Sequence, residues 1–122
     1  LLFLIAVTTP VIAFGHEESS PPLYPSEKIY SPTPLPYRVT LTGEDDTTTT
    51  QSVTWRTDTT VNRGIAQLAL ANANGRALRP KSHEANTSAL TTGDRVAHFH
   101  TVTFRNLQPG TLYTYRVGDG TN

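Results

Sequence analysis

The chain has 122 residues with ten Lys and Arg, ten Asp and Glu, no Cys and no Met, so its formal net charge is zero. A neutral chain lacks the basic surface that binds nucleic acid or anionic lipid, and we therefore expect no nucleic-acid partner. The absence of Cys excludes disulfides, a thiol nucleophile and zinc–thiolate sites. The length suffices for one domain with its own core, but not for a sandwich together with a sizeable catalytic domain.

The first residues have the character of an export signal. Residues 1–14 are apolar and uncharged, but Pro10 interrupts them and they are shorter than the roughly 20 residues that cross a bilayer. Small residues at Ala13 and Gly15 offer a cleavage point before His16. We therefore expect residues 1–15 to be the remnant of a signal peptide and the protein to be secreted or extracytoplasmic, with no other membrane contact. A buried strand is the alternative interpretation of this stretch.

A proline-rich segment follows. Seven of the nine prolines lie at or before Pro36, and the repeated X-Pro steps favour extended, polyproline-like backbone. Residues 16–35 are therefore predicted to be a Pro/Ser-rich linker, with the folded unit beginning near Pro36. A ligand for a proline-recognising domain is the alternative for this segment.

From Tyr37 onward, apolar and polar residues alternate as they do in half-buried strands. The pattern predicts strands at 37–42, 51–57, 65–71, 96–104 and 112–117. The Asn-Gly step at 74–75 predicts a tight turn, with a short return strand at 76–80. A helix over 65–73 is the alternative, because Ala and Leu favour helices. The polar residues 81–94 are expected to form a loop.

Short strands separated by Gly, Pro and Asn predict an all-β, fibronectin-III/immunoglobulin-like antiparallel β-sandwich. Val53 and Trp55 share one face of their strand, so Trp55 is expected to fill the core. The spacing from Leu107 and Pro109 to Tyr113 predicts a tyrosine corner, in which the tyrosine is buried and its hydroxyl bonds the 107–111 backbone. Because the chain has no Met and stops at Asn122 directly after an expected strand, we interpret it as a fragment whose sandwich lacks its last strand.

Three blocks of sequence give a closer resemblance. They are PYRVTL at 36–41, SVTWRT at 52–57 and HTVTFRNLQPGTLYTYRVGD at 100–119. Together they resemble the N-terminal domain of purple acid phosphatases, over nearly the whole expected folded unit, 36–122. In that family this domain precedes a metallophosphoesterase catalytic domain.

The resemblance implies a non-catalytic module of a secreted enzyme. The missing C-terminal domain would hydrolyse phosphate monoesters with two metal ions, Fe with Fe, Zn or Mn, and would be this module's main partner, with a homodimer as a further one. Its metal ligands would come from motifs of the forms GDxG, GDxxY, GNHE and GHxH. A fibronectin-III-like binding or spacer module of another extracellular protein is the alternative function.

No catalytic, cofactor-binding or metal-binding residue is predicted in this chain. The "GD" pairs at Gly93-Asp94 and Gly118-Asp119 are not followed by the rest of any motif. His98 and His100 would share one face of a strand, but two imidazoles are too few for a metal site; we expect His100 to pack in the sandwich and His98 to lie near a strand end.

Two surface features complete the sequence interpretation. The acidic run Glu44-Asp45-Asp46 lacks calcium-loop spacing and is predicted to be a solvated turn. Asn86-Thr87-Ser88 fits the N-glycosylation pattern and is placed in an exposed loop. Mass spectrometry of the secreted protein would show whether Asn86 carries a glycan.

Overall fold

The computed structural model describes residues 25–71 and 79–121. The predicted signal segment, the first part of the predicted linker and the Asn-Gly turn lie outside the described residues. The elements are α1 (Ser26–Tyr30), β1 (Tyr37–Thr42), β2 (Gln51–Thr57), β3 (Ile65–Leu70), β4 (Lys81–Glu84), β5 (Asn86–Thr92), β6 (Arg95–Phe104) and β7 (Tyr113–Gly118).

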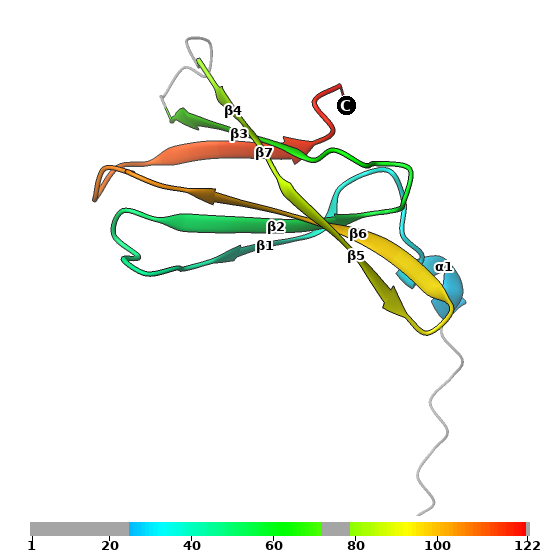
Figure 1. Cartoon of the computed structure of the whole chain (residues 1–122). Helices are drawn as coiled ribbons and strands as arrows, with labels where there is room; N and C mark the ends of the chain where they lie inside the picture. Colours follow the sequence, from blue (N-terminus) through cyan, green and yellow to red (C-terminus); the bar gives the residue numbers. More distant parts are fainter. Residues whose placement is uncertain (1–24, 72–78, 122) are drawn as a thin grey trace, which may run out of the picture.

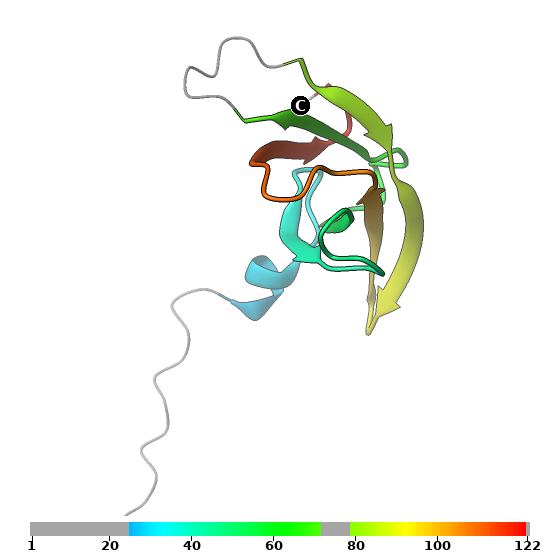
Figure 2. The ribbon, with the colours of Figure 1, turned by 90° about the vertical axis from the view of Figure 1, so that its left-hand side faces the viewer.

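The strands form two sheets that face each other (Figures 1 and 2). One sheet has the order β1-β2-β6-β5 and the other the order β4-β3-β7, and every pairing is antiparallel. The predicted β-sandwich is confirmed. Residues 65–70 form a strand rather than the alternative helix, because Ala66 and Ala69 are buried on opposite faces while neighbouring strands supply the hydrogen bonds.

The core lies between the sheets and is built around one large aromatic ring. Its buried members are Val53, Trp55, Ala66, Val102 and Phe104. Trp55 is fully buried at the centre of β2, as the alternation in 51–57 predicts. On β6 the even-numbered residues from His98 to Phe104 face the same interior. Inward and outward side chains therefore alternate on both β2 and β6.

The two long sides of the sandwich are closed in different ways. On one side the chain passes from β4 in one sheet to β5 in the other through Ala85 alone, whose N–H donates to the Gly64 carbonyl at 2.9 Å (Figure 1). On the other side lie the edge strands β1 and β7. There Leu41 and Tyr115, at interior register positions, remain 48% and 37% exposed, so this side is the more open one.

The tyrosine corner forms, but its ring is less buried than predicted. The Gln108 N–H donates to the Tyr113 hydroxyl at 3.0 Å, which confirms the predicted backbone bond. Tyr113, Tyr115 and Val117 lie opposite Leu70, Leu68 and Ala66, on the inner face of their sheet. Tyr113 is nevertheless only half-buried, and it takes part in lining two open hollows.

The expectation of a loop over 81–94 is wrong. Residues 81–84 and 86–92 form two strands joined through Ala85, and Lys81–Glu84 pairs with β3. Of the predicted return strand 76–80, residues 76–78 lie outside the described residues and 79–80 are not in a strand. Ser, Thr, His and Asn dominate these strands, so they carry no apolar alternation. Their pairing is decided by the neighbouring strands β3 and β6.

The end of the predicted linker is folded against the sandwich. Ser26–Tyr30 forms a short helix instead of extended backbone. The Asp58 N–H donates to the Thr33 carbonyl at 2.8 Å, and Arg56 Nη2 donates to the Tyr30 carbonyl at 3.0 Å. Within residues 25–71 and 79–121, no helix is long and apolar enough to cross a membrane.

Truncating Trp55 tests the sandwich directly. Trp55→Ala should lower the free energy of unfolding by about 3–5 kcal/mol, because it removes a fully buried ring from the centre of a small core. Leu112, which is 77% exposed, provides the control, and Leu112→Ala should change the free energy of unfolding by less than about 0.5 kcal/mol. Urea titration followed by circular dichroism measures both. Equal effects of the two substitutions would contradict the assigned core.

Candidate functional site

The two strand histidines lie inside the sandwich, next to Trp55. The ring centroids of His98 and His100 are 6.2 Å apart with nearly perpendicular planes. His100 stacks on Trp55, with a centroid distance of 5.3 Å and an interplanar angle of 30°. His100 is fully buried, which confirms its predicted place in the sandwich, whereas His98 is half-buried and is the fourth of the ten residues of β6, further from the strand end than predicted.

Both nitrogens of His100 are engaged by threonine hydroxyls. Nε2 lies 2.8 Å from Thr57 Oγ1, and Nδ1 lies 2.8 Å from Thr87 Oγ1. Thr57 Oγ1 also donates to the Asp58 carbonyl at 3.0 Å, so its single proton is used. Nε2 of the neutral ring therefore donates to Thr57, and Nδ1 accepts from Thr87. This network joins β2, β5 and β6 through one side chain.

Burial lowers the pKa of His100 below its ordinary value of 6.5, and the nearby His98 lowers it further. Desolvation acts in this direction because it penalises the charged imidazolium. His98 Nδ1 donates to the Val61 carbonyl at 2.8 Å, which fixes its ring as well. His100 is thus held as a neutral, hydrogen-bonded part of the core.

This arrangement does not suit a metal ion. A ligating imidazole needs a free lone pair, and the Nδ1 lone pair of His100 accepts from Thr87 while Nε2 carries a proton. Among the residues that the structure describes, no group of three or more His, Cys, Asp or Glu side chains gathers at one place. The histidines stabilise the sandwich instead.

The acidic residues 44–46 stabilise the loop before β2. Asp46 accepts from the Thr48 N–H at 3.0 Å and from the hydroxyls of Thr48 and Thr49 at 2.6 and 3.0 Å. These hydrogen bonds, chiefly that of the Thr48 hydroxyl, lower the pKa of Asp46. Glu44 and Asp45 form ion pairs with Arg105 at 3.6 and 3.5 Å. The solvated turn predicted from the sequence has this additional role of fixing the loop.

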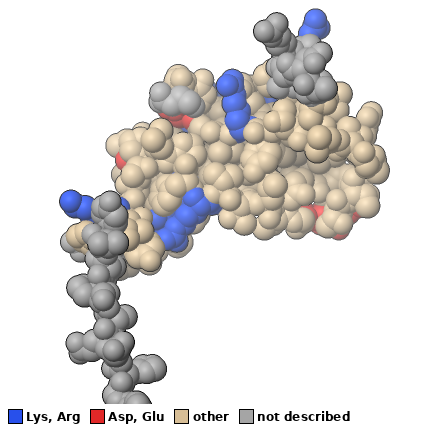
Figure 3. Space-filling model, turned by 180° about the vertical axis from the view of Figure 1, so that it is seen from behind, with Lys and Arg blue, Asp and Glu red and all other residues tan. Residues whose placement is uncertain are grey.

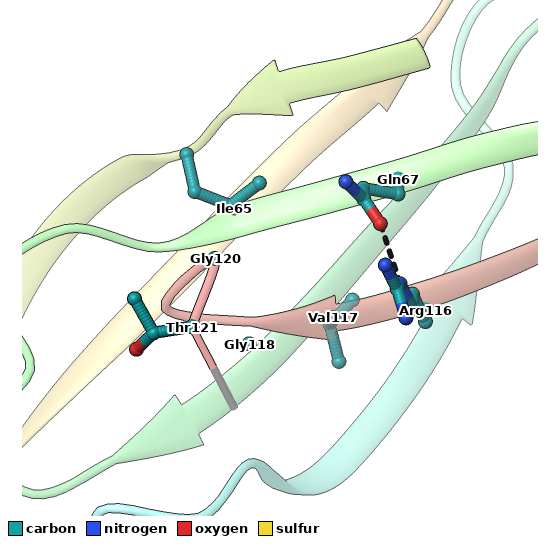
Figure 4. Close-up of a pocket in the computed structure, with 7 residues that line it drawn as sticks. All are labelled: Ile65, Gln67, Arg116, Val117, Gly118, Gly120 and Thr121. Atoms are coloured by element: carbon teal, nitrogen blue, oxygen red, sulfur yellow. Dashed lines mark hydrogen bonds between the residues drawn. The ribbon is translucent and has the colours of Figure 1, made fainter. Parts of the chain in front are cut away.

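The two "GD" aspartates also lie in turns. Asp94 follows Gly93, whose φ of +63° suits the tight turn between β5 and β6. Asp119 Oδ1 accepts from both the N–H and the hydroxyl of Thr121 at 2.8 Å. Figure 4 shows the small hollow beside this second turn, where Arg116 bonds the Gln67 side chain. Asp119 thus stabilises its turn, whereas the exposed Asp94 side chain lies 3.7 Å from Arg95.

The glycosylation pattern lies in a strand rather than in the predicted loop. Asn86 is the first residue of β5 and is exposed, as is Ser88. Between them Thr87 turns inward to His100. The sequence could not show this, because the middle position of the pattern is free to be any residue except proline.

The two antiparallel sheets, the central tryptophan and the tyrosine corner define a fibronectin-III-like β-sandwich. Comparison with protein families identifies it further. The family described as "Purple acid Phosphatase, N-terminal domain" matches residues 36–122, and the chain belongs to this family. No curated protein and no solved structure gives a significant match.

The buried histidine makes stability depend on pH. Unfolded chains bind a proton at His100 near pH 6.5, but the folded protein does so only at lower pH, so the free energy of unfolding should fall as the pH drops below about 6.5. His100→Gln removes the titrating group. Urea midpoints at about pH 8 and about pH 5 should differ more in the wild type than in this variant. Equal differences would show that other groups cause the pH dependence.

Gly64 lies against the stacked rings and leaves no room for a side chain. A Cβ atom there would lie 2.7 Å from His100 Cγ and 2.8 Å from Trp55 Cζ2. Gly64→Ala should therefore cost about 1–3 kcal/mol of the free energy of unfolding. Adding Trp55→Phe removes one of the clashing atoms, so the double variant should lose less stability than the sum of the single variants. Strict additivity in urea unfolding would contradict the proposed clash.

Proposed function

We propose that this chain is the non-catalytic N-terminal module of a secreted purple acid phosphatase. A catalytic domain that follows the module hydrolyses phosphate monoesters. The observation that carries the proposal is the family match over 36–122, which takes in every strand of the sandwich.

The metal centre of this proposal belongs to the following domain. The described residues of the module do not fit a di-metal site, since the His100 nitrogens are engaged by Thr57 and Thr87 and the aspartates stabilise turns. When bound in the catalytic domain, two metal ions, Fe with Fe, Zn or Mn, supply a metal-bound nucleophile and stabilise charge on phosphorus. No residue of this chain is assigned a part in that step.

The module's task in this proposal is that of a scaffold. β7 is an edge strand, and the chain runs on from its end through Gly118 to Thr121 at the border of the sandwich (Figure 1). The catalytic domain would join and contact the module on this side, where Leu41 and Tyr115 are exposed. A homodimer is a second proposed partner. Export is proposed from the signal-like residues 1–15.

Phosphatase assays test whether the activity belongs to the following catalytic domain and not to this module. The purified 122-residue chain should show no turnover of p-nitrophenyl phosphate from acid to neutral pH, even with added iron, zinc or manganese. The full-length product of the same gene should hydrolyse it in a metal-dependent way. The two proteins are compared at equal molar concentration, with chelator-treated samples as controls.

Each result has a definite meaning. Metal-dependent turnover by the chain alone would overturn its assignment as a non-catalytic module. A well-folded but inactive full-length protein whose sequence lacks the GNHE and GHxH motifs would favour the binding or spacer module instead.

A further inference from the structure

A hollow of about 410 Å³ lies on the outer face of the four-stranded sheet, beside α1. Its lining includes three arginines, Arg38, Arg56 and Arg95, and one carboxylate, Asp94. Leu90 and Ala97 provide an apolar part of the wall. Figure 3 shows Lys and Arg side chains close together at one end of the molecule.

The three arginines reach the hollow from three different strands. Arg38 lies where the β1 register shifts, with a φ of +51° that is unusual for a residue with a side chain. Arg56 lies near the end of β2, and Arg95 begins β6. The chain has no net charge, and Arg38 and Arg95 are 57 positions apart in it. Strand pairing therefore brings together arginines that are distant in the sequence.

Aromatic rings orient two of the guanidinium groups. Arg56 Cζ lies 4.3 Å from the centroid of the Tyr37 ring, and Arg38 Cζ lies 5.7 Å from that of Tyr30. Arg56 Nη2 is further fixed by the Tyr30 carbonyl at 3.0 Å. A guanidinium that stacks on a ring keeps its N–H groups in the plane, where they can donate to oxygen atoms.

Two buried polar atoms of the same stacked pair have no partner. Arg56 Nε and Tyr37 Oη are both inaccessible to solvent and form no hydrogen bond with the residues described. Because neither atom is accessible to solvent and Tyr37 does not line the hollow, these two atoms lie behind its wall and not in the space that it encloses.

The charge of the described lining residues favours an anion. Asp94, whose side chain is 93% exposed, lies 3.7 Å from Arg95 and offsets one of the three positive charges. Among the described residues no carboxylate pairs with Arg38 or Arg56, and the space beside them is far larger than one water molecule. Arginine N–H groups match the oxygens of phosphate and sulfate, which accept hydrogen bonds from several directions at once.

We propose that this hollow is a binding site for a tetrahedral oxyanion, either a free phosphate or sulfate ion or the terminal group of a small ester. Arg38, Arg56 and Arg95 supply the charge and the donors, and the Tyr30 segment closes one side. The site lies in the module itself and does not depend on a following catalytic domain. It is a binding site without chemistry.

Titration with inorganic phosphate tests the proposal. Amide and arginine side-chain NMR signals of the ¹⁵N-labelled chain are followed at constant ionic strength, with sulfate and acetate as comparison anions and phenyl phosphate as a small ester. Phosphate and sulfate should cause saturable shifts at Tyr30, Arg38, Arg56 and Arg95. Acetate should bind at least about tenfold more weakly, because a carboxylate offers fewer acceptor oxygens and one charge.

Matched arginine variants distinguish a specific binding site from nonspecific electrostatic attraction. Arg38→Gln should weaken phosphate binding about tenfold or more, while Arg116→Gln, on the outer face of the other sheet, should leave it unchanged. Unchanged amide spectra elsewhere show that the variants fold. If phenyl phosphate binds more tightly than phosphate, the ligand is a small ester. If phenyl phosphate binds more weakly, the ligand is the free ion.

Three results would overturn the proposal. They are the absence of saturable shifts, equal binding of acetate and phosphate, and equal weakening by Arg38→Gln and Arg116→Gln. In each case Arg38, Arg56 and Arg95 would be ordinary surface arginines and not an anion-binding site.

Discussion

The fit of Gly64 against the stacked rings of Trp55 and His100 is the constraint on which the centre of this small sandwich depends. Trp55 comes from β2 and His100 from the neighbouring β6, and the histidine nitrogens tie these strands to Thr57 and to Thr87 on β5. Gly64 lies close against both rings and leads into β3 of the opposite sheet. The centre of the fold is therefore partly polar, and it is stable because every ring nitrogen of His100 has a partner. A core with so few large apolar side chains depends on this close fit.

The closed side of the sandwich is linked to this centre through Gly64. Ala85 carries the chain from one sheet to the other, and its N–H bonds the carbonyl of Gly64. The strand pair β4 and β5 thus covers the edge next to His100, where Thr87 reaches inward. Within the described residues no strand crosses between the sheets on the opposite side, between β1 and β7, and interior side chains such as Leu41 and Tyr115 remain accessible there. The sandwich therefore has one closed side and one more open side.

Histidines and carboxylates, the residue types that usually attract attention as catalytic candidates, have structural tasks in this chain. His100 fills the core, Asp46 and Asp119 fix turns, and Glu44 pairs with Arg105. The functional interest shifts to arginines, which no local motif singles out. Arg38, Arg56 and Arg95 meet on the outer face only because β1, β2 and β6 are joined in one sheet.

The sequence by itself determined the fold class, the family, the core position of Trp55 and the hydrogen bond of Tyr113. Each depends on local alternation or on a short spacing such as that from Pro109 to Tyr113, and these are written in neighbouring residues. Only the tertiary structure decided that polar residues 81–92 form strands, that Ser26–Tyr30 is helical and that Tyr113 is half-buried. It also decided the partners of His100 and the meeting of the three arginines. These features come from contacts between distant segments, whose geometry is fixed by sheet register and not by the pattern of adjacent residues.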